Sequence, residues 1–220
     1  MTLDFDRDGA VRVPRAINTL EWIEFLEPYA EAAAGVRLHG LAGLTERLGT
    51  GSVACDVATS LIGKPARPVR AILFNKTAAN NWPLGWHQDR TIAIAARHEV
   101  EGFGPWTVKQ GLLHVEPPVA VIAGMITVRI HLNDVDADNA PLRVALGSHL
   151  LGRIAESDYD AVTSRHDILT CLADAGDIWA YSTPILHASA AAARPRQRRV
   201  LQVDYAAEPL PTPLEWAGLG

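Results

Sequence analysis

The chain has 220 residues, a length that suits one folded domain. Its hydrophobic fraction of 48% is enough for a packed core and excludes an intrinsically disordered protein. A net charge of −5 lacks the basic excess of a general nucleic-acid binder, and no apolar run approaches the roughly 18 residues of a membrane-spanning helix. Two distant cysteines and an acidic N-terminus without a signal-peptide core predict a cytoplasmic protein.

The first 64 residues are predicted to form a mostly helical support region. A short strand is expected at 10–13. Asn18 and Glu21 form a capping-box-like start for a helix that we expect to run to about Ala34 and to stop at Gly35. Two shorter helices are expected at 41–48 and 53–62, before Gly63-Lys64-Pro65 ends the region.

From Pro68 onward, short strands separated by Pro, Gly, Asn and Asp turns replace the helices. This pattern favours an antiparallel sandwich or barrel over alternating β-α units. We predict a single domain over 1–220 with a mainly β fold and flanking helices, a β core over 66–205 and a C-terminal tail over 206–220. The candidate strands are 69–76, 85–91, 125–133, 142–145, 177–181, 185–189 and 198–205.

The segment 92–124 lacks a clear period and is predicted to be a long lid or binding loop. Three of its residues, Trp106, Lys109 and His114, are candidates for substrate contact, and Trp82 is a fourth at the mouth of a site. Ordinary loop packing is the alternative for all four. No strand is evident around His114, so we expect it to lie in the loop.

Two of the expected strands combine one apolar face with one polar face. Arg129 and His131 share a face of the strand at 125–133, and Arg198 shares a face with Gln202 and Asp204. These faces either meet solvent or line a wet, charged barrel interior; the pattern allows both. If they line a cavity, Arg198 is its buried cation, Arg199 points outward, and His131 is a hydrogen-bonded core histidine. The alternative for the arginines is a solvated hairpin tip.

His87 and Asp89 stand two residues apart on a predicted strand, so their side chains project from the same face. His187 follows in another strand. Two histidines and one carboxylate on one face of a metal form the facial triad of non-haem Fe(II) enzymes. A guanidinium such as that of Arg198 gives a carboxylate two parallel charge-assisted hydrogen bonds.

These motifs resemble the phytanoyl-CoA dioxygenase family of 2-oxoglutarate oxygenases over most of the chain. The resemblance implies a double-stranded β-helix fold, with Fe(II) on His87, Asp89 and His187, and Arg198 pairing with the far carboxylate of 2-oxoglutarate. It also implies that Ile72, Gln88 and Arg129 line the co-substrate site and that Ser189 donates to the co-substrate. The matching segments are Phe5–Gly9, Ile72-Leu73-Phe74-Asn75-Lys76, Trp86-His87-Gln88-Asp89, 138–149, Gly176-Asp177, His187-Ala188-Ser189 and Arg198.

Three positions depart from the family pattern, and none of them is a predicted metal ligand. They are Ala140 where Gly is usual, Leu146 where Pro is usual, and Ala192 where Asn is common. The implied reaction is hydroxylation of an unactivated C–H bond of a small molecule, with O2 as second co-substrate and release of succinate and CO2. Asp89 retains the carboxylate that related halogenases lack, which favours hydroxylation over halogenation. We expect a monomer or homodimer without nucleic-acid or membrane partners.

Two other classes of function remain open at this point. The first is a non-redox, metal-dependent cupin-like enzyme, which would use the same His and Asp residues but would not need Arg198. The second is a binding module of the same fold that has lost turnover and binds iron weakly or not at all.

Overall fold

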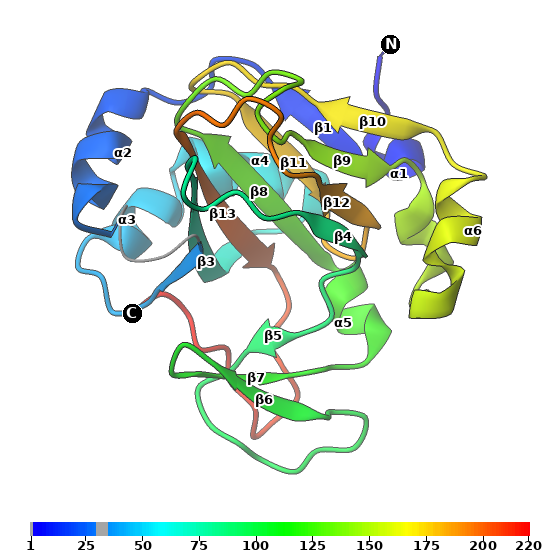
Figure 1. The fold of residues 1–220 in the computed structure, drawn as a ribbon. Helices are drawn as coiled ribbons and strands as arrows, with labels where there is room; N and C mark the ends of the chain where they lie inside the picture. Colours follow the sequence, from blue (N-terminus) through cyan, green and yellow to red (C-terminus); the bar gives the residue numbers. More distant parts are fainter. Residues whose placement is uncertain (1, 30–34) are drawn as a thin grey trace.

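The computed structural model describes residues 2–29 and 35–220, and two antiparallel sheets form its centre (Figure 1). The first sheet has six strands in the order β1 (Ala10–Val13), β11 (Ile178–Ser182), β8 (Met125–His131), β13 (Arg198–Ala206), β3 (Arg67–Lys76) and β2 (Gly35–Leu38). The second has four strands in the order β10 (Ile168–Cys171), β9 (Leu142–Ala145), β12 (His187–Ser189) and β4 (Leu84–His87). The expected mainly β fold with flanking helices is confirmed.

Helices from the first 64 residues cover the outer face of the six-stranded sheet. Ile130, Leu201 and Leu73 of that face are fully buried in one hydrophobic cluster with residues of these helices. The helices are α1 (Phe5–Asp8), α2 (Thr19–Leu26), α3 (Leu44–Leu48) and α4 (Val53–Ile62), and two further short helices, α5 (Val119–Ala123) and α6 (Tyr159–Thr163), follow later. None of the helices in the described residues is long and apolar enough to cross a membrane.

The expected helix from Asn18 to about Ala34 ends earlier than predicted. Asn18 caps it as expected, because its side chain accepts from the Leu20 backbone N–H at 3.2 Å. The α-helix ends at Leu26, and a 3₁₀ turn that contains Pro28 follows, since proline cannot donate the next helical hydrogen bond. Residues 30–34 lie outside the described residues, and Gly35 opens strand β2 instead of stopping a helix. The helical region therefore also supplies β1 and β2 to the core sheet.

The segment 92–124 is not a structureless loop, and this prediction was wrong. It contains a small third sheet in the order β5 (Ile92–Ala93), β7 (Leu112–Val115) and β6 (Trp106–Lys109), followed by helix α5. Figure 1 shows this sheet at one end of the molecule, beside the C-terminal segment. Leu210 and Leu214 of that segment are buried against it. These strands have only two to four residues, too few to produce a readable alternation.

The polar faces of the core strands point into the space between the two large sheets. Arg129 and Gln202 are opposite each other on β8 and β13, and Gln202 is also opposite Ile72 on β3. All three line one cavity, while their sequence neighbours Ile130, Leu201 and Leu73 pack on the helices. Of the two interpretations that the sequence allowed, the charged interior is therefore the correct one.

Candidate active site

A cavity of about 180 Å³ lies between the two large sheets and brings most of the predicted site residues together. It has six basic side chains and one carboxylate in its wall, so it is strongly cationic. The predicted residues in its wall are Ile72, Trp82, His87, Asp89, Lys109, Arg129, His187, Ser189 and Arg198.

His87 and His187 face each other across the β4–β12 pair, where the two residues are direct partners. Their ring centroids are 4.1 Å apart. The Nδ1 atom of His87 lies 2.8 Å from the Gly85 carbonyl oxygen, and that of His187 lies 2.9 Å from the Ile185 carbonyl oxygen. Because a backbone carbonyl requires Nδ1 to carry the proton, Nε2 of each ring is left with a lone pair for a ligand.

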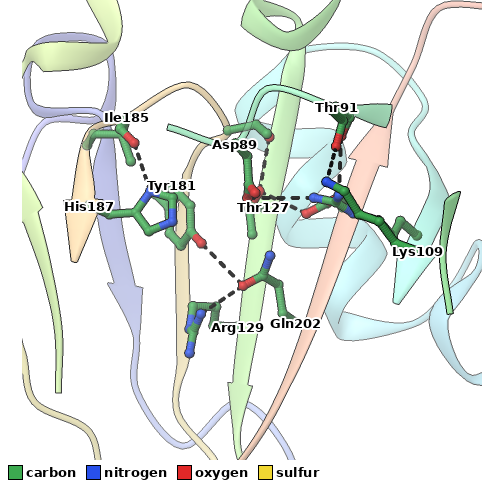
Figure 2. Close-up of polar contacts among 12 residues, drawn as sticks. Asp89, Thr91, Lys109, Thr127, Arg129, Tyr181, Ile185, His187 and Gln202 are labelled. Atoms are coloured by element: carbon green, nitrogen blue, oxygen red, sulfur yellow. Dashed lines mark hydrogen bonds and ion pairs between the residues drawn. The ribbon is translucent and has the colours of Figure 1, made fainter. Parts of the chain in front are cut away.

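Burial, together with the neighbouring His87, lowers the pKa of His187 to about 4. The imidazole is therefore neutral at neutral pH, and this is the form that binds metals. The Tyr181 ring lies 5.6 Å from the His187 ring and helps to enclose it, as Figure 2 shows.

Asp89 follows β4 and presents its carboxylate to the same cavity. Burial alone would raise the pKa of Asp89, but Arg70 first, and then His187 and His87, lower it overall. Its Oδ2 atom is buried without a hydrogen bond and lies 3.6 Å from Nη2 of Arg70. Arg70 itself donates from Nε to Oδ2 of Asp204 at 2.5 Å, so Asp204 is its principal partner.

As the side chains stand, no group of three or more His, Cys, Asp and Glu residues within 2–29 and 35–220 is arranged to hold a metal ion. The chemistry of the donor set nevertheless fits a divalent cation of the iron type. Two imidazoles have Nε2 available, and one carboxylate oxygen is buried without a hydrogen bond. Binding requires the Asp89 carboxylate to turn from Arg70 towards the two rings.

Arg198 and Arg199 have opposite environments, as the strand phase predicted. Arg198 is 3% exposed and lines the cavity, where its Nη1 donates to the Ala140 carbonyl oxygen. Arg199 points the other way and donates to Oε2 of Glu27 at 2.6 Å. Burial and the neighbouring Arg129 lower the pKa of Arg198, which means that both disfavour its charged form. A bound anion would therefore offset this desolvation and repulsion.

Ala140 adopts a left-handed backbone conformation with φ of 53°, at a position where the resembled family usually has glycine. Its carbonyl accepts from the Ser189 hydroxyl at 3.0 Å as well as from Arg198. The turn therefore keeps its left-handed conformation although alanine replaces glycine, and its carbonyl positions the side chains of Ser189 and Arg198. Lys76 is a further buried cation in this part of the cavity, and its Nζ lies 3.2 Å from Ser189 Oγ.

A second set of hydrogen bonds joins Arg129, Gln202 and Tyr181 beside the cavity (Figure 2). Arg129 Nη1 donates to Gln202 Oε1 at 2.7 Å, and the Tyr181 hydroxyl donates to the same oxygen at 3.5 Å. Nε of Arg129 is buried and has no hydrogen-bond partner in the described part of the chain. Arg129 thus keeps donor capacity for a bound anion beside Arg198.

Three predicted residues are not in the wall of this cavity. Gln88 is fully used by the fold, because its amide bonds the Gly152 and Pro184 carbonyls and the Ile154 N–H. Trp106 packs in the core of the small sheet. His114 does not lie in a loop: it is fully buried on β7, with Nδ1 2.9 Å from the Leu112 carbonyl oxygen.

His131 is buried as expected, but it is not a satisfied core histidine. Neither of its ring nitrogens has a hydrogen-bond partner among the described residues. Burial first, and then Arg129 and Arg198, lower its pKa to about 3, so the ring is neutral.

The sequence analysis missed several residues of the cavity wall. Arg70 and Phe74 alternate with Ile72 on one strand face, so the period that located Ile72 was also a signal for them. Lys76 continues the same alternation; its residue type alone favoured a surface lysine over a second cation of the site, and the structure buries it in the cavity wall. Arg37 had no such signal, because its strand lies where a helix stop was expected.

Comparisons with known proteins give a family match and several similar folds. The family model described as phytanoyl-CoA dioxygenase (PhyH) matches residues 5–200. No curated protein sequence matches the chain.

Three solved structures are similar to this chain at low identity. EctD from S. alaskensis, solved with 2-oxoglutarate and 5-hydroxyectoine, is 18% identical with a TM-score of 0.67, covering 92% of this chain and 73% of EctD. The epimerase SnoN, from nogalamycin biosynthesis, was solved with Fe3+, alpha ketoglutarate and nogalamycin RO; it is 18% identical with a TM-score of 0.66, covering 92% of this chain and 80% of SnoN.

The carbocyclase SnoK from the same biosynthesis is 18% identical with a TM-score of 0.64, covering 91% of this chain and 80% of SnoK. Identities this low show the fold alone. The chain thus has the double-stranded β-helix, or jelly-roll, fold that the sequence predicted.

Proposed function

Because this chain belongs to the phytanoyl-CoA dioxygenase family, we propose that it is an Fe(II)- and 2-oxoglutarate-dependent oxygenase that hydroxylates an unactivated C–H bond of a small molecule. O2 is the second co-substrate, and succinate and CO2 are released. One observation carries the proposal: His87, Asp89 and His187 share a cavity with the buried guanidinium of Arg198, which forms no ion pair with any described residue.

In this proposal His87, Asp89 and His187 hold the iron through two Nε2 atoms and one carboxylate oxygen. The metal, when bound, supplies the O2 activation that amino-acid side chains cannot perform. The two backbone carbonyls at Nδ1 hold the rings in the tautomer and orientation that a metal needs.

Arg198 binds the far carboxylate of 2-oxoglutarate, with Arg129, Ser189 and Ile72 beside it. Arg198 and Lys76 are direct partners on β13 and β3, so two cations meet at this end of the cavity. A dianion placed here offsets their mutual repulsion and their burial. Hydroxylation is favoured over halogenation because Asp89 supplies a carboxylate ligand.

Alanine at each predicted metal ligand tests the site directly. His87→Ala, Asp89→Ala and His187→Ala should each abolish iron-dependent succinate formation, because the remaining two donors bind Fe(II) weakly. Metal content after anaerobic loading with Fe(II), and stabilisation by Mn(II) in thermal unfolding, should fall in parallel. His166→Ala, a histidine outside the cavity, is the control. Normal turnover by two of the three variants would refute the site.

The two rival functions differ from this one in the same assay. A non-redox metal enzyme would bind the metal but would form no succinate from 2-oxoglutarate. A silent binding module would bind neither iron nor co-substrate well. Product analysis must accompany the assay, since the similar structures include an epimerase and a carbocyclase as well as EctD with its hydroxylated ligand.

A further inference from the structure

The structure assigns a second anion-binding position to this cavity, formed by Arg37 and Lys109, and we propose that it holds the carboxylate or phosphate group of the substrate. The two side chains come from different parts of the fold, strand β2 and the β6–β7 hairpin, and both line the cavity. The identification of the bound group as part of the substrate rests on the proposed function. The binding of an oxyanion at this position does not depend on it.

Arg37 is directed into the cavity by its strand pairing. It is opposite Ile72 on the neighbouring strand β3, and cross-strand partners lie on the same face of a sheet. Its Nε atom is buried without a hydrogen-bond partner. Among the described residues, Arg37 forms no ion pair, and the carboxylate of Asp89 acts on it only at longer range.

Lys109 approaches the same place from the end of β6. Its Nζ atom donates to Thr91 Oγ1 at 2.9 Å, as Figure 2 shows. It also forms no ion pair within the part of the chain that the structure describes. Two further donor hydrogens of the ammonium are therefore left for a ligand.

A dedicated contact holds these two like charges together. The side chain of Gln110, the residue after Lys109, accepts from the Arg37 backbone N–H at 2.8 Å and donates to the Gly35 carbonyl at 2.8 Å. The hairpin turn is thus attached to the edge of β2 by both ends of one amide. Like charges that the fold holds close repel each other unless an anion lies between them.

Arg70, the third cation in this region, is already occupied. It donates to Asp204 at 2.5 Å and to the Thr91 carbonyl at 3.2 Å, and it lies 3.6 Å from Asp89. Burial, followed by repulsion from Arg70, lowers the pKa values of both Arg37 and Lys109. The free anion-binding capacity therefore belongs to Arg37 and Lys109.

This position is distinct from the one at Arg198. Arg37 is opposite Ile72 on β3, and Ile72 is opposite Gln202 on β13, four residues along that strand from Arg198. At about 3.3 Å per residue, the backbone level of Arg37 is about 13 Å from that of Arg198. Asp89 interacts electrostatically with both Arg70 and Lys109, and it lines the same cavity as Arg37 and Lys109. One position serves the co-substrate, and the other is left for a substrate acid.

Calorimetric titration of the full-length, metal-free protein with inorganic phosphate and with succinate tests the position. The Arg198→Ala variant weakens the anion site at Arg198, so that the part of the remaining binding that depends on Arg37 and Lys109 reports on the second position. We expect this variant to bind at least one of the two anions at one equivalent, and Arg37→Gln or Lys109→Gln, added singly, to weaken that binding about tenfold or more. Phosphate binding alone indicates a phosphorylated substrate, and succinate binding alone indicates a carboxylic acid.

The matched control is Lys64→Gln with Arg97→Gln, two exposed cations paired with Glu208 and Glu99, which should leave both titrations unchanged. With Arg198 intact, Arg37→Gln and Lys109→Gln should keep 2-oxoglutarate binding within about twofold. The proposal is overturned if Arg198→Ala binds neither anion, if the two substitutions have no effect, or if they remove 2-oxoglutarate binding. If the anion binds at Arg37 and Lys109 but the wild type forms no succinate, the proposed function fails and this position stands.

Discussion

Single residues decide how charge is distributed in this site, and adjacent residues can have opposite roles. Arg198 and Arg199 carry the same charge one position apart, yet one is buried in the cavity and the other pairs with Glu27 at the surface of the helical layer. The alternation of a β-strand is the whole cause of this difference. The same alternation links Arg70, Ile72, Phe74 and Lys76 on β3.

The two arginines should therefore respond differently to truncation. Arg198→Ala should weaken 2-oxoglutarate binding by about 30-fold or more, equivalent to about 2 kcal/mol, because a buried charge pair with the carboxylate is lost. Arg199→Ala removes a partly exposed ion pair and should change binding by less than about twofold. Calorimetry in the presence of Mn(II) measures both. Equal losses in the two variants would mean that the strand phase has no bearing on co-substrate binding.

At the scale of elements, the sequence predicted some strands and helices with their correct bounds and missed several short strands. Strand β9 and helix α4 have the predicted bounds, and the expected strand at 10–13 is β1. By contrast, β2, β10 and the small sheet of β5, β6 and β7 were missed. Each depends on a partner distant in the sequence, Gly35–Leu38 on β3 and the β6–β7 turn on β2.

The contact of Gln110 with β2 should be separable from the rest of the fold. Gln110→Ala removes two hydrogen bonds, so the free energy of unfolding should fall by about 1–2 kcal/mol, and the Arg37 amide should exchange its hydrogen faster. Hydrogen exchange measures the second effect residue by residue.

Asn81→Ala is the matched control, because Asn81 makes the same two-ended contact with the backbone of Ala192. It should increase exchange at Ala192 and leave the Arg37 amide unchanged. Unchanged exchange at Arg37 in Gln110→Ala would mean that the hairpin does not depend on this contact.

At the scale of the whole molecule, the two sheets enclose more positive charge than the fold neutralises. The chain carries a net charge of −5, yet six basic side chains and a single carboxylate line the cavity. Desolvation of these cations opposes folding in the absence of ligand. Anionic ligands should therefore stabilise the protein by mass action.

Lys76 makes this cost measurable as a function of pH. Burial first, and then Arg198 and Arg129, lower its pKa from 10.5 to about 8. The folded protein therefore loses this proton at lower pH than the unfolded chain. Between about pH 8 and 10.5 the unfolded state binds more protons, so this residue makes the free energy of unfolding rise with pH.

Urea unfolding of the ligand-free wild type and of Lys76→Met, compared at several pH values, isolates the contribution. Other groups titrate in both proteins and cancel in the difference. The wild type should gain stability relative to Lys76→Met as pH rises from 8 to 10.5. A difference that stays constant across this range would show that Lys76 titrates alike in the folded and unfolded states.

The sequence by itself determined the antiparallel β core and the strand faces, because these depend on local periodicity, and its motifs predicted His87, Asp89, His187 and Arg198 as the site residues. Only the tertiary structure decided that the polar faces enclose a cavity, that Gln88 is used by the fold, and that Arg37 and Lys109 line the same cavity. The physical reason is that these features come from contacts between segments far apart in the chain. No local pattern encodes which cations the folded sheets bring together.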